Sequence, residues 1–157
     1  MNKHLDAEAT TNPLEIRLGH WLRPVSNQVS GSFASALQQR QLSVAEWVAL
    51  NHVDTHPEVT AAALADAMGM TRGAISKVLD KLQARQWLVR STSQRDNRVQ
   101  LLALTPSGRR VLPPLRDIAD RNDEHFFAVL GTTERVALRR LLQQLANAHR
   151  INTLPVD

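Results

Sequence analysis

The side chains best suited to chemistry in this sequence are the cationic ones between Thr71 and Arg98. These 28 positions hold seven Lys or Arg residues and two Asp residues, a local net charge of +5. The rest of the chain carries 12 basic and 13 acidic residues, so this segment accounts for the formal charge of +4. A concentrated basic surface suits binding to phosphate, although a solvated helix face would carry similar charge. The arrangement of these residues must therefore decide between the two.

The spacing of apolar residues predicts a helix that begins after Thr71. Ile75, Val78, Leu79 and Leu82 lie at i, i+3, i+4 and i+7, so one face is buried. Away from that stripe the helix is basic and hydroxylated, and a glycine near its start allows close approach; the candidate DNA-contacting residues here are Thr71, Arg72, Gly73, Ser76, Lys77 and Lys81. A preceding helix, capped by Thr60 and ended by Gly69, completes a helix-turn-helix whose second helix can lie in a major groove.

The pattern then changes to two strands, over residues 87–91 and 99–104, around a polar stretch. This predicts a hairpin, or wing, that carries Arg95 and Arg98 toward a neighbouring minor groove or the DNA backbone. Asp96 would be repelled by phosphate, so we expect its carboxylate to hold an arginine by a charge-assisted hydrogen bond. Arg98 is the first candidate partner, and Arg95 could compete with it.

The flanking segments predict long helices with exposed apolar stripes. One begins near Pro13 and should kink or break near Leu22 because of Pro24; another begins at Pro106 and should kink at Pro113 and Pro114. The last carries Leu138, Leu141, Leu142 and Leu145 on one face. The central segment is too small to cover these stripes, so we expect a homodimer, with a monomeric bundle as the alternative. A two-fold dimer would place its two DNA-reading helices about 34 Å apart.

These elements predict a mainly α fold with a small β-hairpin wing. Residues 1–41 would form an N-terminal dimerisation helix, residues 42–105 the winged helix-turn-helix core, and residues 106–157 the C-terminal dimerisation helices. The chain has no Cys, which excludes disulfides, thiolate metal clusters and thiol switches. We identify no nucleophile with a base, paired carboxylates or phosphate-binding glycine loop, so neither an enzyme nor a cofactor is expected. No export signal or membrane-spanning run is recognised, which predicts a cytoplasmic protein.

Histidine and tryptophan residues offer two further hypotheses. His52 and His56 are four residues apart, a spacing that can seat a metal, but Pro57 indicates that the helix has ended and no third ligand is adjacent. We therefore predict no metal site. His20, Trp21 and Trp47 could line a crevice for an aromatic effector, or could simply be core residues.

The order of motifs resembles the multiple antibiotic resistance regulator family, MarR. The motifs are LSVAEW (42–47), AAALADAMGMTRGAISKVLDKL (61–82), DNR (96–98) and LTPSGR (104–109). The resemblance implies dimeric winged helix-turn-helix regulators, usually repressors, that bind palindromic promoter DNA and are often released by small aromatic ligands. It matches Thr71, Arg72, Ser76 and Lys77 to recognition-helix contacts. It also matches Arg95 and Arg98 to wing contacts and Asp96 to the bracing acid.

The sequence departs from this family pattern at two positions. Gln86 stands where the family usually has Gly after the recognition helix, so a left-handed backbone there would cost about 1 kcal/mol or must be avoided, and we expect a slightly different helix exit. Pro24 is a less usual residue in the first helix. The alternative function is a winged helix that binds protein, which would need an apolar or acidic reading face.

Overall fold

The computed structural model describes residues 12–157, which form six α-helices and one two-stranded hairpin. This confirms the predicted fold class. Residues 1–11 of the predicted N-terminal segment lie outside the described residues. In chain order the elements are α1 (Leu18–Gln38), α2 (Val44–Thr55), α3 (Ala61–Ala67), α4 (Arg72–Ala84), β1 (Leu88–Thr92), β2 (Gln100–Leu104), α5 (Pro106–Phe127) and α6 (Thr132–Ala148).

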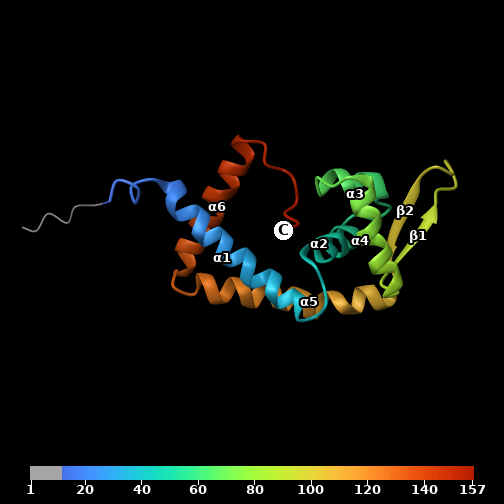
Figure 1. Ribbon diagram of the computed structural model, residues 1–157, viewed down its shortest axis with the longest axis horizontal. Coiled ribbons are helices and arrows are strands. Elements are labelled where there is room, and N and C mark those ends of the chain that lie inside the picture. The colour runs from blue at the N-terminus through green and yellow to red at the C-terminus, as the bar shows by residue number, and fades with distance from the viewer. Residues whose placement is uncertain (1–11) are drawn as a thin grey trace, which may run out of the picture.

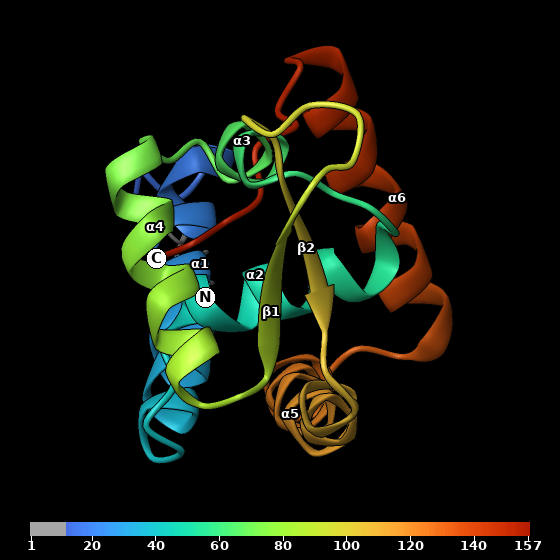
Figure 2. The same ribbon diagram turned by 90° about the vertical axis from the view of Figure 1, so that its right-hand side faces the viewer.

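The molecule is elongated, with α5 running along its length (Figure 1). Helices α1 and α6 lie toward one end, whereas α2, α3, α4 and the hairpin form the other. Figure 2 shows the hairpin lying across α2, with the start of α5 at its foot. The strands pair antiparallel, with Leu88 opposite Leu104 and Thr92 opposite Gln100. None of the described helices combines the length and the apolar character needed to cross a bilayer.

Hydroxyl caps fix where four of the helices begin. The side chains of Ser43, Thr60, Thr71 and Thr105 each accept a hydrogen bond from the backbone N–H three residues later. Ser43 is also part of a full capping box, because its own N–H donates to the Glu46 carboxylate at 2.8 Å. The helix starts predicted after Ser43, Thr60, Thr71 and Thr105 are thus confirmed.

The prolines do not interrupt their helices, so of the kink or break expected near Leu22 the break does not occur. Helix α1 begins at Leu18, later than the predicted Pro13, and continues through Pro24 to Gln38. Helix α5 continues through Pro113 and Pro114, where buried Leu112 and Leu115 anchor it to the core. An interior proline removes one backbone hydrogen bond, and the intact turns on both sides of it keep the helix continuous.

The apolar core lies in the half of the molecule that holds the helix-turn-helix. Its fully buried large side chains include Leu50, Leu64, Leu79, Leu82 and Leu88. The same cluster takes in Leu37 from α1 and Leu112 and Leu115 from α5, so it extends on both sides of the 42–105 segment. The start of α5 and the end of α1 are therefore packed into the winged core.

The helix exit at Gln86 differs from our expectation. Gln86 adopts a left-handed backbone with φ 59°, the conformation for which glycine is usual, so the different exit expected there is wrong. The Trp87 N–H donates to the Leu82 carbonyl at 3.1 Å, and the Thr105 hydroxyl donates to the Gln86 carbonyl at 2.6 Å. These bonds hold a turn that leads directly from α4 into the wing.

The C-terminal segment returns from α6 to the helix-turn-helix, a contact that sequence reasoning did not foresee. The Leu154 N–H donates to the Ala67 carbonyl at the end of α3, at 3.0 Å. Leu154 and Val156 pack against the core cluster. Gly69 (φ 60°) lies so close that a Cβ there would be 2.8 Å from the Thr153 methyl group. The C-terminal segment thus packs against the turn between α3 and α4.

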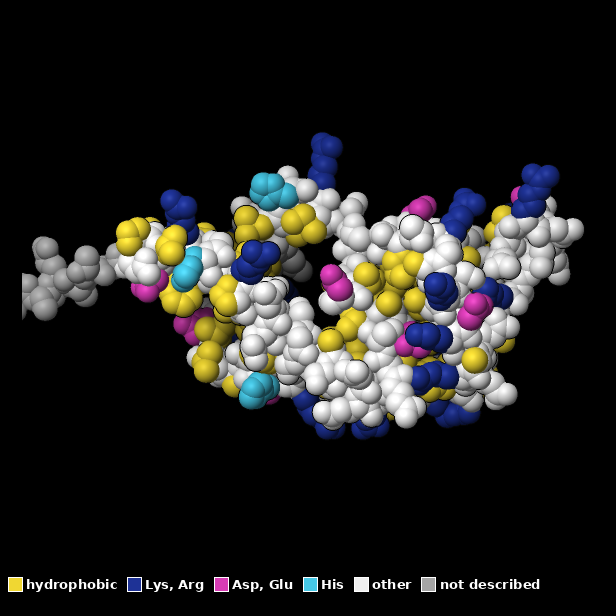
Figure 3. Space-filling view, viewed as in Figure 1, with side chains coloured by type: hydrophobic (Ala, Val, Ile, Leu, Met, Phe, Trp, Pro, Cys, Tyr) yellow, Lys and Arg dark blue, Asp and Glu magenta, His cyan; other side chains and the backbone are white. Residues whose placement is uncertain are grey.

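Two apolar stripes remain uncovered by any other part of residues 12–157. Helix α6 has no buried residue, and Leu141, Leu142 and Leu145 are 48, 43 and 51% exposed. On α1, Trp21, Leu22 and Val25 are about half exposed. Hydrophobic side chains gather over both helices in the space-filling view (Figure 3). Such stripes are typical of surfaces that a second chain covers.

Candidate nucleic-acid interface

Helix α4 presents a basic face to solvent because its apolar face is fixed in the core. Ile75, Val78, Leu79 and Leu82 are buried, which sets the rotation of the helix. Of the predicted contact residues on this helix and its cap, Ser76 is half-buried and the others are exposed: Thr71, Arg72, Gly73, Lys77 and Lys81. The backbone N–H groups of the first turn add a site that favours anions.

A tight turn places this helix after α3. Gly69 takes a left-handed backbone, and the Met70 N–H donates to the Ala65 carbonyl at 2.9 Å, which satisfies the end of α3. The Thr71 hydroxyl then accepts from the Ala74 N–H at 3.2 Å and starts α4. The two short helices therefore form the predicted helix-turn-helix.

The wing tip carries two exposed arginines, Arg95 and Arg98. Asp96 does brace the turn, but not by the contact we expected. Its Oδ1 accepts from the backbone N–H of Arg98 at 2.9 Å, and no ion pair joins it to either guanidinium in residues 12–157. The Asp96 carbonyl also accepts from the Val99 N–H at 3.0 Å. Asp96 thus shapes the backbone, because a two-residue spacing favours this local turn over a side-chain pair.

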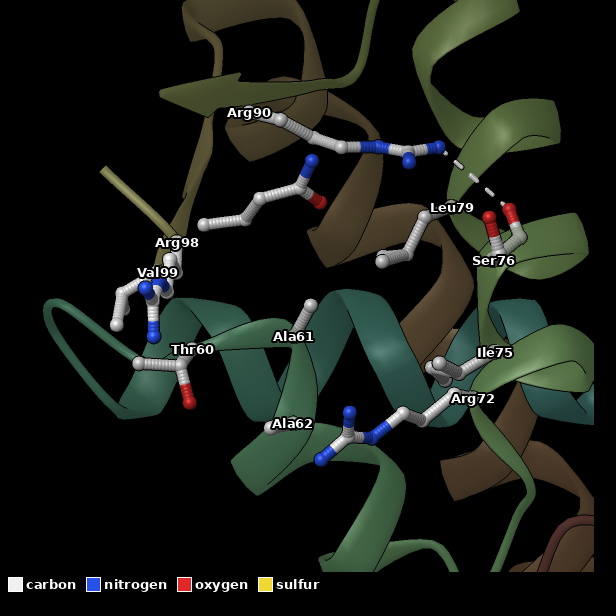
Figure 4. A pocket seen from close by; sticks show the side chains of 11 residues that line it. Thr60, Ala61, Ala62, Arg72, Ile75, Ser76, Leu79, Arg90, Arg98 and Val99 are labelled. Carbon is white, nitrogen blue, oxygen red and sulfur yellow. Dashed lines mark hydrogen bonds between the residues drawn. The ribbon is translucent and has the colours of Figure 1, made fainter. Parts of the chain in front are cut away.

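A cavity of about 500 Å³ lies between the recognition helix, α3 and the wing (Figure 4). Its guanidinium groups come from Arg72, at the start of α4, and from Arg90 and Arg98 on the hairpin side. Ile75 and Leu79 supply apolar lining. Across residues 12–157, neither Arg72 nor Arg98 has an acidic side chain within ion-pair distance. Arg72 and Arg98 therefore contribute positive charge that no ion pair neutralises, whereas Arg90 is paired with Asp80.

Arg90 is the residue of this surface that sequence reasoning missed. It counted only toward the basic excess, yet its side chain is 17% exposed and reaches across to α4. Its Nη2 donates to the Asp80 carboxylate and lies 3.5 Å from the Ser76 carbonyl oxygen. Strand alternation contained the signal, because Arg90 shares a face with buried Leu88. An inward-facing arginine needs a partner.

The three residues predicted for an effector pocket do not meet within one chain. Trp21 packs edge-on against His20 and donates from Nε1 to the Glu15 carbonyl at 2.8 Å. Trp47 instead packs edge-on against Phe33, with ring centroids 5.0 Å apart. Since Phe33 lies twelve residues after Trp21 on α1, these two sites are about 18 Å apart along the helix. His20, Trp21 and Trp47 therefore do not line one pocket within a single chain, although all three lie on or beside α1.

His52, on α2, and His56, the C-cap of that helix, are stacked on each other. The rings of His52 and His56 lie 3.9 Å apart and nearly parallel. His56 Nδ1 is 3.0 Å from the His52 carbonyl oxygen, which occupies one of its nitrogens. Partial burial, and then the neighbouring His56, lower the pKa of His52. Residues 12–157 bring no three His, Cys, Asp or Glu side chains together around a possible metal.

Comparisons with known proteins agree with this geometry. A model of the MarR family matches residues 40–98, which hold the helix-turn-helix and much of the wing. A protein named as a regulator of the hcr operon in Thauera aromatica is 29% identical over 153 residues, covering 92% of each chain.

Two solved structures extend the likeness to the whole fold. The transcriptional repressor CouR, bound to a 23-mer DNA duplex, is 28% identical with a TM-score of 0.76, covering 89% of this chain and 99% of its own. BpsR of Bordetella bronchiseptica, studied for regulation of its DNA binding by 6-hydroxynicotinic acid, is 25% identical with a TM-score of 0.71, covering 83 and 93%. The family-model match over the helix-turn-helix and wing, together with the likeness of the whole fold, supports a MarR-family winged-helix transcriptional regulator.

Proposed function

We propose that this protein is a homodimeric repressor that reads double-stranded promoter DNA with α4 in the major groove and the wing beside it. The observation that carries the proposal is the exposed basic surface around Arg72 and Arg98, since neither arginine forms an ion pair with an acidic side chain of residues 12–157. The likeness to CouR in its DNA complex supports the same docking. A protein-binding wing would need an apolar or acidic surface instead.

The side chains of α4 divide into base readers and phosphate contacts. Arg72, at the helix start, is placed to reach a guanine edge, while Thr71 and Ser76 offer hydroxyls to phosphate or bases. Lys77 and Lys81 neutralise phosphate, and Gly73 leaves room for the backbone to approach. Arg95 and Arg98 contact the minor groove or the backbone beyond the helix, on a turn that Asp96 shapes.

The second copy of the chain is proposed to cover the apolar stripes of α1 and α6. Two-fold symmetry then presents two α4 helices to one side of a duplex, about 34 Å or one helical turn apart, so the DNA site is palindromic. Association by these helices leaves the reading surfaces free, because stripes and basic surface lie at opposite ends of the molecule.

A small aromatic acid is the proposed effector, since BpsR responds to one. His20, Trp21 and Trp47 remain the predicted ligand residues. In one chain Trp21 and Trp47 lie far apart, so a pocket that uses both would include the second subunit. A ligand bound there would change the spacing of the two α4 helices without contacting DNA.

Selection of binding sites from a random pool of duplexes tests the proposal. The selected site should be palindromic, and affinity should fall steeply as salt increases. Arg72→Ala should cost about 1–3 kcal/mol and relax preference at one base pair, whereas Lys77→Ala should weaken all sequences alike and reduce the salt slope by about 1. Anisotropy titrations at two salt concentrations measure both effects. A chain that selects no duplex, even at low salt, would refute DNA reading and favour the protein-binding alternative.

A further inference from the structure

An ion pair joins the wing to the middle of the recognition helix. The Arg90 guanidinium, on β1, bonds to the Asp80 carboxylate on α4. It also points to the Ser76 carbonyl one turn earlier (Figure 4). The Arg90 side chain is only 17% exposed, whereas that of Asp80 is 68% exposed. A largely buried cation is thus held by an acid on the surface that we propose to face DNA.

Arg90 of this ion pair lines the same cavity as the two groups that would have to contact DNA together. Arg72 begins α4, Arg98 ends the wing turn, and both line the same cavity as Arg90. The hairpin is anchored from the other side by the Leu102 N–H, which donates to the Val59 carbonyl at 2.9 Å. Arg90 and Asp80 thus complete the attachment of the wing, on the side that faces α4.

We propose that Arg90 and Asp80 are positioning residues, which set the wing against α4 so that Arg72 and Arg98 engage one duplex in register. The inference rests on the proposed DNA reading and concerns how that surface is held. A bound phosphate need not touch Arg90, because its Nη2 is already engaged by Asp80 and directed to Ser76.

Two explanations of Asp80, repulsion of DNA and positioning of Arg90, predict opposite changes in DNA affinity when the Asp80 charge is removed. If Asp80 only repels DNA, Asp80→Asn should tighten binding, because an acid leaves a basic surface. If Asp80 holds Arg90 in place, the same change should weaken binding. Asp66 provides the matched control, since it is exposed on the neighbouring α3 and no ion pair involving it is found in residues 12–157.

The test titrates the full chain with the selected site and with an unrelated duplex of equal length. We expect Asp80→Asn and Arg90→Met each to weaken the selected site about tenfold, and the double variant to be no weaker than Arg90→Met alone, the non-additivity of a coupled pair. The unrelated duplex should be bound equally well or better by Asp80→Asn. Asp80→Glu should restore most of the affinity, and Asp66→Asn should bind at least as tightly as wild type.

Two results would overturn the proposal. One is an Asp80→Asn variant that binds the selected site as tightly as Asp66→Asn does. The other is an Arg90→Met variant that weakens both duplexes equally and lowers the salt slope, which would mean that Arg90 contacts phosphate directly. Thermal melting shows whether a variant has lost DNA affinity because it unfolds. If Asp80→Asn melts early, Asp80→Glu provides a second variant that keeps the charge. Failure of the wild type to bind either duplex would refute DNA reading itself.

Discussion

Replacement of the α6 stripe tests whether a second chain covers it. We consider the triple variant Leu141→Ala, Leu142→Ala and Leu145→Ala, which keeps good helix formers at every position. Because α6 has no buried residue, the folded subunit should tolerate the change. The three side chains together form the apolar surface that we expect to meet the partner.

The expected loss of dimer affinity follows from how much of each leucine is exposed in the single chain. Each leucine is 43–51% exposed, so a partner can bury about half of it. Leu→Ala removes three carbons at about 0.8 kcal/mol each when fully covered, and half coverage therefore gives about 1 kcal/mol per residue. Six such residues in a dimer give about 6 kcal/mol, which raises the dimer Kd by about four orders of magnitude.

Sedimentation velocity over a concentration series measures this shift. The variant should sediment as a monomer at concentrations where the wild type is a dimer, with an unchanged circular dichroism spectrum. Val129→Ala is the control, because Val129 is 86% exposed and lies in the loop between α5 and α6. A triple variant that remains a dimer at wild-type concentrations, or a wild type that is monomeric at tens of micromolar, would refute the reasoning.

Three further substitutions give clear expectations. Gly73→Ala should stabilise the free chain by about 0.5–1 kcal/mol, since a Cβ there meets no atom within 4 Å, but should weaken DNA binding if the backbone approaches the duplex; melting and anisotropy measure the two. Gly69→Ala should lower the free energy of unfolding by about 1–2 kcal/mol from its left-handed backbone alone, with more from the Thr153 contact. Gly31→Ala on open α1 should instead be neutral or stabilising in the same denaturant titration, and equal effects at both glycines would contradict this account. Folding lowers the pKa of His52 below its ordinary value of 6.5. As the pH falls from 6.5 toward this lower pKa, His52 therefore binds a proton more readily in the unfolded chain than in the folded one. The wild type should therefore lose stability over that interval and His52→Gln should lose less, and parallel curves would contradict the assignment.

The sequence predicts the reading helix well because several local signals agree there. Thr71 caps the helix, Gly69 ends the one before, and four apolar residues fix which face is buried. Each of these acts within one or two turns, so no distant contact is needed to recognise it. The wing strands follow for the same reason, since alternation and a polar turn are both local.

The parts that were missed depend on contacts between distant segments. Arg90 needs Asp80 ten residues earlier, and Leu154 needs Ala67 on another element. Asp96 shows the opposite kind of error, in which a local contact was overlooked. Its charge suggested a bond to an arginine side chain, whereas its carboxylate accepts from the backbone N–H of Arg98. At Pro24 the break, one of the two expected outcomes, does not occur, because the helix continues.

The link between α5 and α2 bears on how an effector could release DNA. Arg116 of α5 donates to Asn51 Oδ1 at 2.8 Å and to Asp54 Oδ2 at 2.7 Å, both on α2, beside the buried Leu112 and Leu115. Because side chains from α5 are part of the core that also holds α4, we expect any movement of α5 to move α4 as well. The proposed ligand between subunits would therefore rotate α5 together with the winged core of each subunit. This rotation would alter the spacing of the two α4 helices, and with it the DNA affinity, while each wing would keep its position against its own α4.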